Sequence, residues 1–183
     1  LTTLYNILKK RQLFRMNEGA INIEETQGRL KSINDDIKLY FIEPSKSRFI
    51  ISESMLLIGT VVADYASINN INLPYRGQDY VKDRNSLKRG FNESSLTFNN
   101  RLKASLSKSY ISTKPVKHAS LGLNRYVQFT SPIRRYIDLL AHYQINNHLE
   151  QDNEISLKNI DLICNEFSYN QKQNQDIYNQ NRI

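Results

Sequence analysis

A long apolar segment, residues 45–68, places the strongest constraint on how this 183-residue chain folds. Ser45 is suited to cap a helix, and the spacing after it predicts a helix that runs to about Ile68. Apolar side chains nearly surround this helix, which is typical of a helix buried in the middle of a domain. No run of about 18 apolar residues is uninterrupted, so we expect no membrane span. Glu53 is the main polar exception on the helix and is therefore its most informative position.

The segments before it predict one helix and a pair of strands. The first is an amphipathic helix with Arg11 and Arg15 outside its apolar face, and Gly19 is suited to a left-handed cap at its end. Residues 20–24 and 38–42 then predict two paired strands, with a turn formed by residues 34–36.

The rest of the chain predicts mainly helices. Residues 96–106 show the apolar spacing of one helix, and a last helix is expected after Ser156. No repeat or linker marks a second domain. The predicted fold class is α+β, helix-rich, with a few antiparallel strands.

Composition favours a polyanionic partner and excludes some metal sites. Lys and Arg number 25 against 18 for Asp and Glu, a formal charge of +7, which is typical of proteins that bind nucleic acid but is weak evidence alone. The single cysteine, Cys164, excludes an internal disulfide and a zinc site made of cysteines. Its apolar surroundings at helical spacing predict that it is a small buried side chain.

The most informative motif spans residues 126–136. Ser131 and Pro132 predict the start of a helix, which places Arg134 and Arg135 in its first turn. The helix dipole disfavours cations there, so an anion in front of the helix would explain the arrangement. Backbone N–H groups, the hydroxyls of Ser131 and Thr130, and the two guanidinium groups could then converge on one phosphate.

Two other interpretations of this motif stay open. Both arginines can point into solvent or pair with acidic neighbours such as Asp138, four residues after Arg134. Alternatively, residues 131–149 can form the recognition helix of a DNA-binding domain, which requires a short helix and a tight turn before Ser131. The extended character of residues 110–129 argues against this second alternative.

A longer pattern points to a known family. The segment Phe-Thr-Ser-Pro-Ile-Arg-Arg-Tyr-x-Asp-Leu-x-x-His, residues 129–142, resembles the signature of the RNB catalytic region of ribonuclease II and ribonuclease R exoribonucleases. Further segments resemble the family's blocks in the family's order: residues 15–23, 51–57, 73–76 and 118–123. We therefore expect residues 1–183 to be the C-terminal half of an RNB catalytic domain.

The resemblance implies a function and a set of roles. It implies 3′–5′ hydrolysis of single-stranded RNA to nucleoside monophosphates by a monomer in the cytoplasm or an organelle. By the same resemblance Arg134 is the catalytic contact to the scissile-end phosphate, and Arg135 either grips a neighbouring phosphate or helps to position Arg134. Glu53 would contact a ribose hydroxyl. Arg76 is a candidate contact to the RNA backbone, with a structural ion pair as the alternative. His142 matches a family position and is expected to be a structural hydrogen-bonding residue.

The family's aspartate cluster, which holds its metal, has no match in this chain. The resemblance places it upstream of Arg15, so Mg²⁺ is expected for the intact enzyme with ligands outside this chain, and these residues alone are expected to be inactive. The chain also departs from the family pattern at Ser52, Gly59, Gln78 and Gln128. A catalytically inactive RNB-like RNA-binding protein is the alternative, and the presence of the cluster in the whole protein distinguishes the two.

Overall fold

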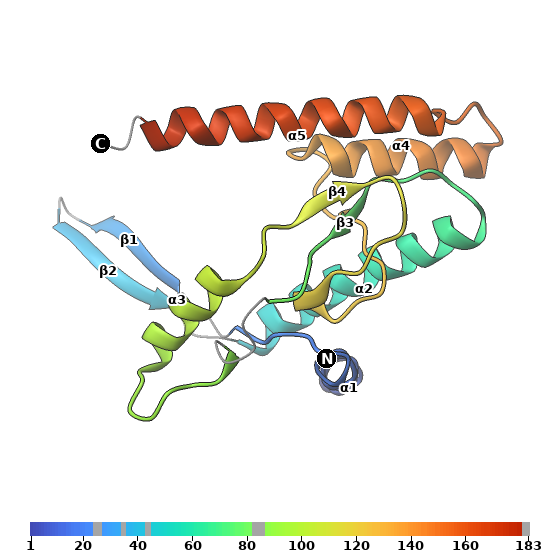
Figure 1. Cartoon of the computed structure of the whole chain (residues 1–183). Helices are drawn as coiled ribbons and strands as arrows, with labels where there is room; N and C mark the ends of the chain where they lie inside the picture. Colours follow the sequence, from blue (N-terminus) through green and yellow to red (C-terminus); the bar gives the residue numbers. More distant parts are fainter. Residues whose placement is uncertain (24–26, 34–35, 43–44, 82–86, 181–183) are drawn as a thin grey trace.

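The fold is helix-rich with two small antiparallel sheets, as Figure 1 shows for the computed structural model, which describes residues 1–23, 27–33, 36–42, 45–81 and 87–180. This confirms the predicted α+β class. The elements in chain order are α1 (Thr2–Asn17), β1 (Gln27–Ile33), β2 (Asp36–Ile42), α2 (Lys46–Ile68), β3 (Tyr75–Gly77), α3 (Ser95–Ser105), β4 (Tyr110–Ser112), α4 (Tyr136–Glu150) and α5 (Leu157–Gln180). A short 3-10 helix, Ala119–Leu121, precedes the motif.

Helix α2 begins and ends where the sequence predicts. The Ser45 hydroxyl accepts a hydrogen bond from the Arg48 N–H at 3.3 Å, so the predicted cap is confirmed. The expectation of burial on all sides is wrong for the described chain: small residues such as Ala63 and Ala66 are buried, whereas Ile51 and Val61 are 61% and 56% exposed. The small residues face β3 and α4, and no described segment covers the large ones.

One helix of the described chain, α2, is long and apolar enough to cross a membrane by length and composition, contrary to expectation. Its place in the structure favours a helix of a folded domain instead. It carries the buried carboxylate of Glu53, and Ala63 and Ala66 belong to a core cluster with residues of other segments.

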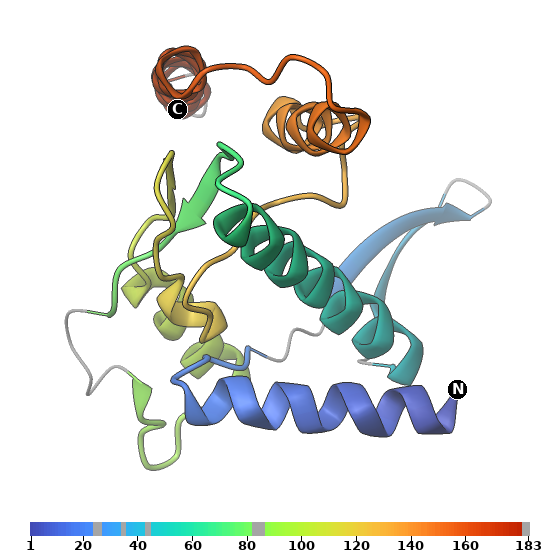
Figure 2. The same ribbon diagram turned by 90° about the vertical axis from the view of Figure 1, so that its right-hand side faces the viewer.

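Helices α1 and α2 are joined through Glu53, which is 2% exposed. Arg15 donates from Nε and Nη2 to the two carboxylate oxygens at 2.9 and 2.5 Å, and Arg11 donates from Nη1 at 2.5 Å. Arg15 also donates from Nη1 to the Leu121 carbonyl oxygen at 2.7 Å. The predicted apolar face of α1 is therefore not the face that packs against the described chain: Leu8 and Arg15 are buried, whereas Ile7 and Phe14 are 59% and 65% exposed. Figure 2 shows α1 lying across the lower end of α2.

The first strand of the hairpin is closer to the turn than predicted. Gln27 to Lys31 pair with Lys38 to Ile42, and the register closes at Ile33 opposite Asp36. Residues 34 and 35 of the predicted turn lie outside the described residues. Residues 20 and 21 are not a strand, because their N–H groups donate to the carbonyl oxygens of Arg15 and Ser120. The predicted left-handed glycine is confirmed, with Gly19 at φ +96°.

Two apolar clusters meet on α4. Ala141 faces α2 and β3 in the first cluster, and Ile137 and Leu140 face α5 in the second. Cys164 lies in the second cluster, as a buried thiol, which confirms the predicted environment. The predicted helices at residues 96–106 and after Ser156 are confirmed as α3 and α5.

Replacing Glu53 tests the joint between the first two helices. Glu53→Gln should lower the free energy of unfolding by about 3–5 kcal/mol, because it leaves two guanidinium groups in a largely buried place without a counter-charge. Chemical denaturation of the chain measures the loss. The control is Glu93→Gln, which removes a more exposed pair with Arg101 and should cost much less. Equal losses of unfolding free energy for the two variants would show that the buried Glu53 contacts stabilise the fold no more than an exposed ion pair does.

Candidate RNA-phosphate site

The arginine motif folds as a turn followed by a helix, and the predicted helix start at Ser131 is wrong. The N–H groups of Arg134 and Arg135 both donate to the Ser131 carbonyl oxygen, at 3.2 and 3.0 Å. The first helical hydrogen bond runs from the Leu139 N–H to the Arg135 carbonyl oxygen at 3.1 Å. Helix α4 therefore begins at Tyr136, and Arg135 is its N-cap residue. Proline fits the turn as well as it fits a first helical position, because both require a similar φ.

Asp138 fixes this turn from the first turn of α4. Its side chain is fully buried, and its Oδ2 accepts from the Ser131 N–H at 2.9 Å and from Arg135 Nη2 at 2.8 Å. The carboxylate also lies at the N-terminus of the helix, where the dipole favours a negative charge. Of the two arginines that the sequence allows to pair with Asp138, the structure pairs Arg135.

A second contact holds the start of the motif. The Phe129 ring stacks on His142 with ring centroids 3.7 Å apart, and His142 Nε2 is 2.7 Å from the Phe129 carbonyl oxygen. Residues 129 and 131–135 are therefore attached to α4 at two points, about one turn of helix apart. An attachment of this kind limits how far the turn can move.

Arg134 is the exposed member of the arginine pair. No described residue forms a hydrogen bond or an ion pair with its side chain, and its neighbour Ile133 is fully exposed. Thr130 and Ser131 are half-buried, and their hydroxyls make no hydrogen bond within the described ranges. These three groups from one short segment are the ones that remain available to an external anion.

A second cationic residue lies next to the turn. Arg76, on β3, donates from Nε to the Ser109 hydroxyl at 3.0 Å. Burial, together with the nearby charge of Arg135, lowers the pKa of Arg76. The Arg76 N–H also donates to the Tyr126 carbonyl oxygen at 2.8 Å, so β3 places this cation beside the segment that leads into the arginine turn.

Two aromatic side chains, those of His118 and Tyr126, pack against each other near Arg76. The His118 and Tyr126 rings meet edge to face, with centroids 5.9 Å apart. Burial, aided by the charge of Arg76, lowers the pKa of His118 to about 4, so His118 is neutral at pH 7. Burial raises the pKa of Tyr126. Neither side chain is charged at neutral pH, so Arg76, Arg134 and Arg135 provide the positive charge of this region.

Glu53 is not part of this arrangement. Both of its carboxylate oxygens already accept hydrogen bonds from Arg11 and Arg15. The contact with a ribose hydroxyl stays a prediction, and the role that the structure gives Glu53 is the joint between α1 and α2.

Other functional classes find little support in the geometry. Within residues 1–23, 27–33, 36–42, 45–81 and 87–180, no three His, Cys, Asp or Glu side chains gather as a metal site would require, so no step is assigned to Mg²⁺ at these residues. The DNA-recognition alternative needs a helix with a free face. It also needs a short helix and a tight turn just before Ser131, whereas residues 122–130 contain no helix and α4 begins only at Tyr136.

Sequence reasoning named Asp138 as an ion-pair partner of the arginines but missed that its carboxylate also accepts from the Ser131 N–H and so fixes the turn. Asp138 is three residues from Arg135, and this spacing is a usable signal for the pair, although the i, i+4 spacing favours Arg134 equally. The structural role expected for His142 is confirmed by its contact with Phe129. The closeness of Arg76 to the segment that leads into the turn depends on tertiary packing, and no local pattern indicates it.

Comparison with known proteins gives the family. The RNB domain model matches residues 1–151. Ribonuclease II, chloroplastic/mitochondrial, of Arabidopsis thaliana is 37% identical over 145 residues, covering 76% of this chain and 18% of that protein. The chain thus spans about a fifth of the length of this curated relative.

Solved structures agree with this assignment. Mycoplasma genitalium RNase R in complex with ribose-methylated single-stranded RNA matches with a TM-score of 0.71 and 25% identity, covering 90% of this chain and 31% of that one. A yeast pseudonuclease shares the fold, with a TM-score of 0.63 and 14% identity over 90% of this chain and 25% of that one. The chain belongs to the RNB domain family, and its relatives include ribonucleases II and R.

Proposed function

We propose that the protein containing this chain is an exoribonuclease that hydrolyses single-stranded RNA from its 3′ end to nucleoside monophosphates. The observation that carries the proposal is the exposed guanidinium of Arg134. It lies on a turn that Asp138 fixes by accepting hydrogen bonds from the Ser131 N–H and from Arg135. A guanidinium group held in this way can neutralise charge that develops on a phosphate during cleavage. Arg135 and Arg76 contribute further positive charge, and the hydroxyls of Ser131 and Thr130 can donate to phosphate oxygens.

The rest of the RNB domain is proposed to cover the exposed apolar side of α1 and α2. Apolar side chains on both helices are open to solvent: Ile7 and Phe14 on α1, and Ile51 and Val61 on α2. An exposed apolar surface of this kind is typical of an interface. The covering segment would also supply the aspartates that bind Mg²⁺, whose chemistry is to activate water and stabilise the leaving oxygen.

An RNA-binding protein without nuclease activity is the second candidate. The same fold is present in a yeast protein described as a pseudonuclease, so the fold alone does not decide between cleavage and binding. The two candidates predict different sequences outside this chain, because only the enzyme requires the aspartate cluster. In either case single-stranded RNA is the proposed ligand, and the cytoplasm or an organelle is the proposed location.

Substitution of Arg134 tests the catalytic role. In the full-length protein, Arg134→Ala should lower kcat by about 100-fold or more while changing RNA affinity far less, because other phosphate contacts hold the strand. Single-turnover cleavage and equilibrium binding of the same oligonucleotide measure the two effects. Arg48→Ala, at an exposed arginine on α2, is the control and should change neither. Equal losses of kcat and affinity would refute the role proposed for Arg134.

Asp138 is proposed to act through the turn that presents Arg134, as a positioning residue. Asp138→Asn should therefore lower kcat and destabilise the fold by about 1–3 kcal/mol, because two donors lose a charged acceptor. In the Arg134→Ala background the same substitution should change kcat little, although it should destabilise the fold as before. A double-mutant cycle measures this coupling. Additive effects on kcat would mean that Asp138 does not act through Arg134.

A further inference from the structure

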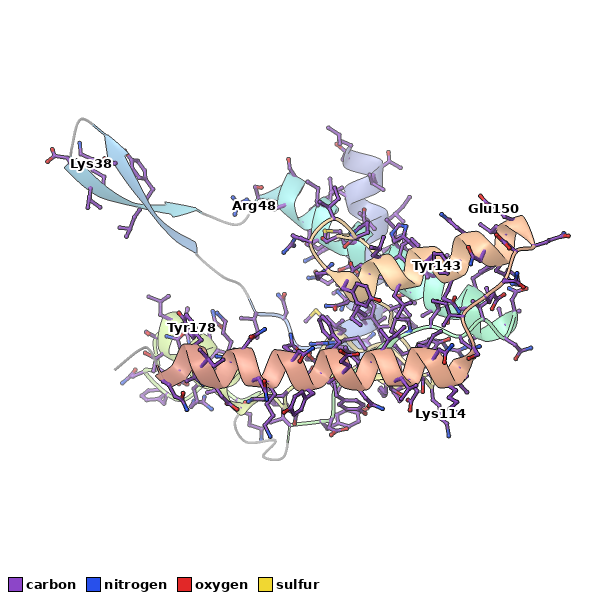
Figure 3. The ribbon with its side chains drawn as sticks, turned by 90° about the horizontal axis from the view of Figure 1, so that it is seen from above. Lys38, Arg48, Lys114, Tyr143, Glu150 and Tyr178 are labelled. Carbon is purple, nitrogen blue, oxygen red and sulfur yellow. The ribbon has the colours of Figure 1, made fainter. Side chains whose placement is uncertain are left out.

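A groove of about 900 Å³ runs between the C-terminal half of α5 and the segment that joins β3, α3 and β4. On the β3–β4 side its lining includes Arg76, Lys103 and Lys108. On the α5 side its lining residues follow the i, i+3, i+4, i+7 pattern of one helix face: Ser168, Gln171, Lys172, Gln175, Asp176 and Asn179. Figure 1 shows this half of α5 extending past α4, and Figure 3 shows Tyr178 near its far end.

The lining suits an anion with polar groups along its length. Among the described residues that line the groove, the cations are Arg76, Lys103, Lys108 and Lys172, and the one carboxylate is that of Asp176. The remaining polar lining consists of serine hydroxyls and side-chain amides, which can donate to phosphate and sugar oxygens without regard to base identity. Leu106 is the one apolar residue in this described lining.

The groove also explains a sequence feature that the proposed function does not use. The end of α5 is rich in Gln and Asn, and residues 168–180 are exposed, so apolar packing does not account for this part of the helix. The RNB domain match ends at residue 151, which means that α5 lies beyond it. One wall of the groove therefore belongs to the matched region and the other does not.

Arg76 connects the groove with the arginine turn. It lines the groove, and its backbone N–H donates at 2.8 Å to the carbonyl oxygen of Tyr126, five residues before Ser131. An RNA strand bound along the groove would thus reach the turn that carries Arg134. We propose that this groove binds the sugar–phosphate backbone of the RNA segment on the 5′ side of the nucleotide held at Arg134. This inference rests on the proposed function.

Charge reversal within the groove tests the inference. The probes are single-stranded oligoadenylates of about 5 and about 20 nucleotides, bound by the full-length protein in EDTA so that no cleavage occurs. The double variant Lys108→Glu with Lys172→Glu should weaken binding of the long probe at least about tenfold and leave the short probe nearly unchanged. The slope of log affinity against log salt for the long probe should become shallower by roughly 0.7 for each phosphate that the variant no longer neutralises.

The control separates the groove from general electrostatics. Lys158→Glu makes the same charge change on an exposed residue of α5 outside the groove, and circular dichroism checks that each variant folds. The matched comparison is with the single variants Lys108→Glu and Lys172→Glu. If Lys158→Glu weakens the long probe as much as either of them, or if both probes weaken equally in the double variant, the groove proposal is wrong. If the unmodified protein binds neither probe, the proposed function itself fails.

Discussion

The buried carboxylate of Glu53 is the interaction on which the arrangement of the N-terminal half depends. A charge so far from water is tolerated only when opposite charges and hydrogen bonds replace the lost hydration. Arg11 and Arg15 provide them, and the same Arg15 guanidinium reaches the Leu121 carbonyl oxygen. Three segments far apart in the sequence therefore meet around one side chain. The segment after Leu121 then passes close to Gly59, where a methyl group would overlap the Tyr126 ring, and continues into the arginine motif.

The two buried carboxylates, those of Glu53 and Asp138, determine which arginines are held within the fold and which remain exposed. Glu53 pairs with both Arg11 and Arg15, and Asp138 pairs with Arg135, so these three guanidinium groups are held in contacts within the fold. Arg134 keeps its charge exposed, and Arg76 lies in the groove beside Lys103 and Lys108. The formal charge of +7 is therefore less informative than the positions of these cations. They are concentrated where a phosphodiester chain would gain most from them.

Much of the fold was predictable because local signals specify it. The Ser45 cap and the apolar spacing after it predict α2, and the Gly19 conformation follows from its place after a helix. Most of the wrong predictions concern groups whose hydrogen-bond partners are far away in the sequence. The side chains of Arg11 and Arg15 look like solvent-exposed cations because their carboxylate is some 40 residues away. The segment at residue 21 looks like a strand, yet its N–H bonds to Ser120. In the site, the motif identifies Arg134 and Arg135, whereas the closeness of Arg76 and the groove along α5 arise only from packing.

The buried thiol of Cys164 has a practical consequence for the chemistry of the molecule. Burial raises its pKa to about 11, so only about one thiol in 10⁴ is a thiolate at pH 7. Because the thiolate is the reactive species in alkylation and disulfide exchange, the sole sulfhydryl of the chain is inert while α4 and α5 remain packed. Its rate of modification by a thiol reagent therefore reports how often these two helices separate, without any engineered label.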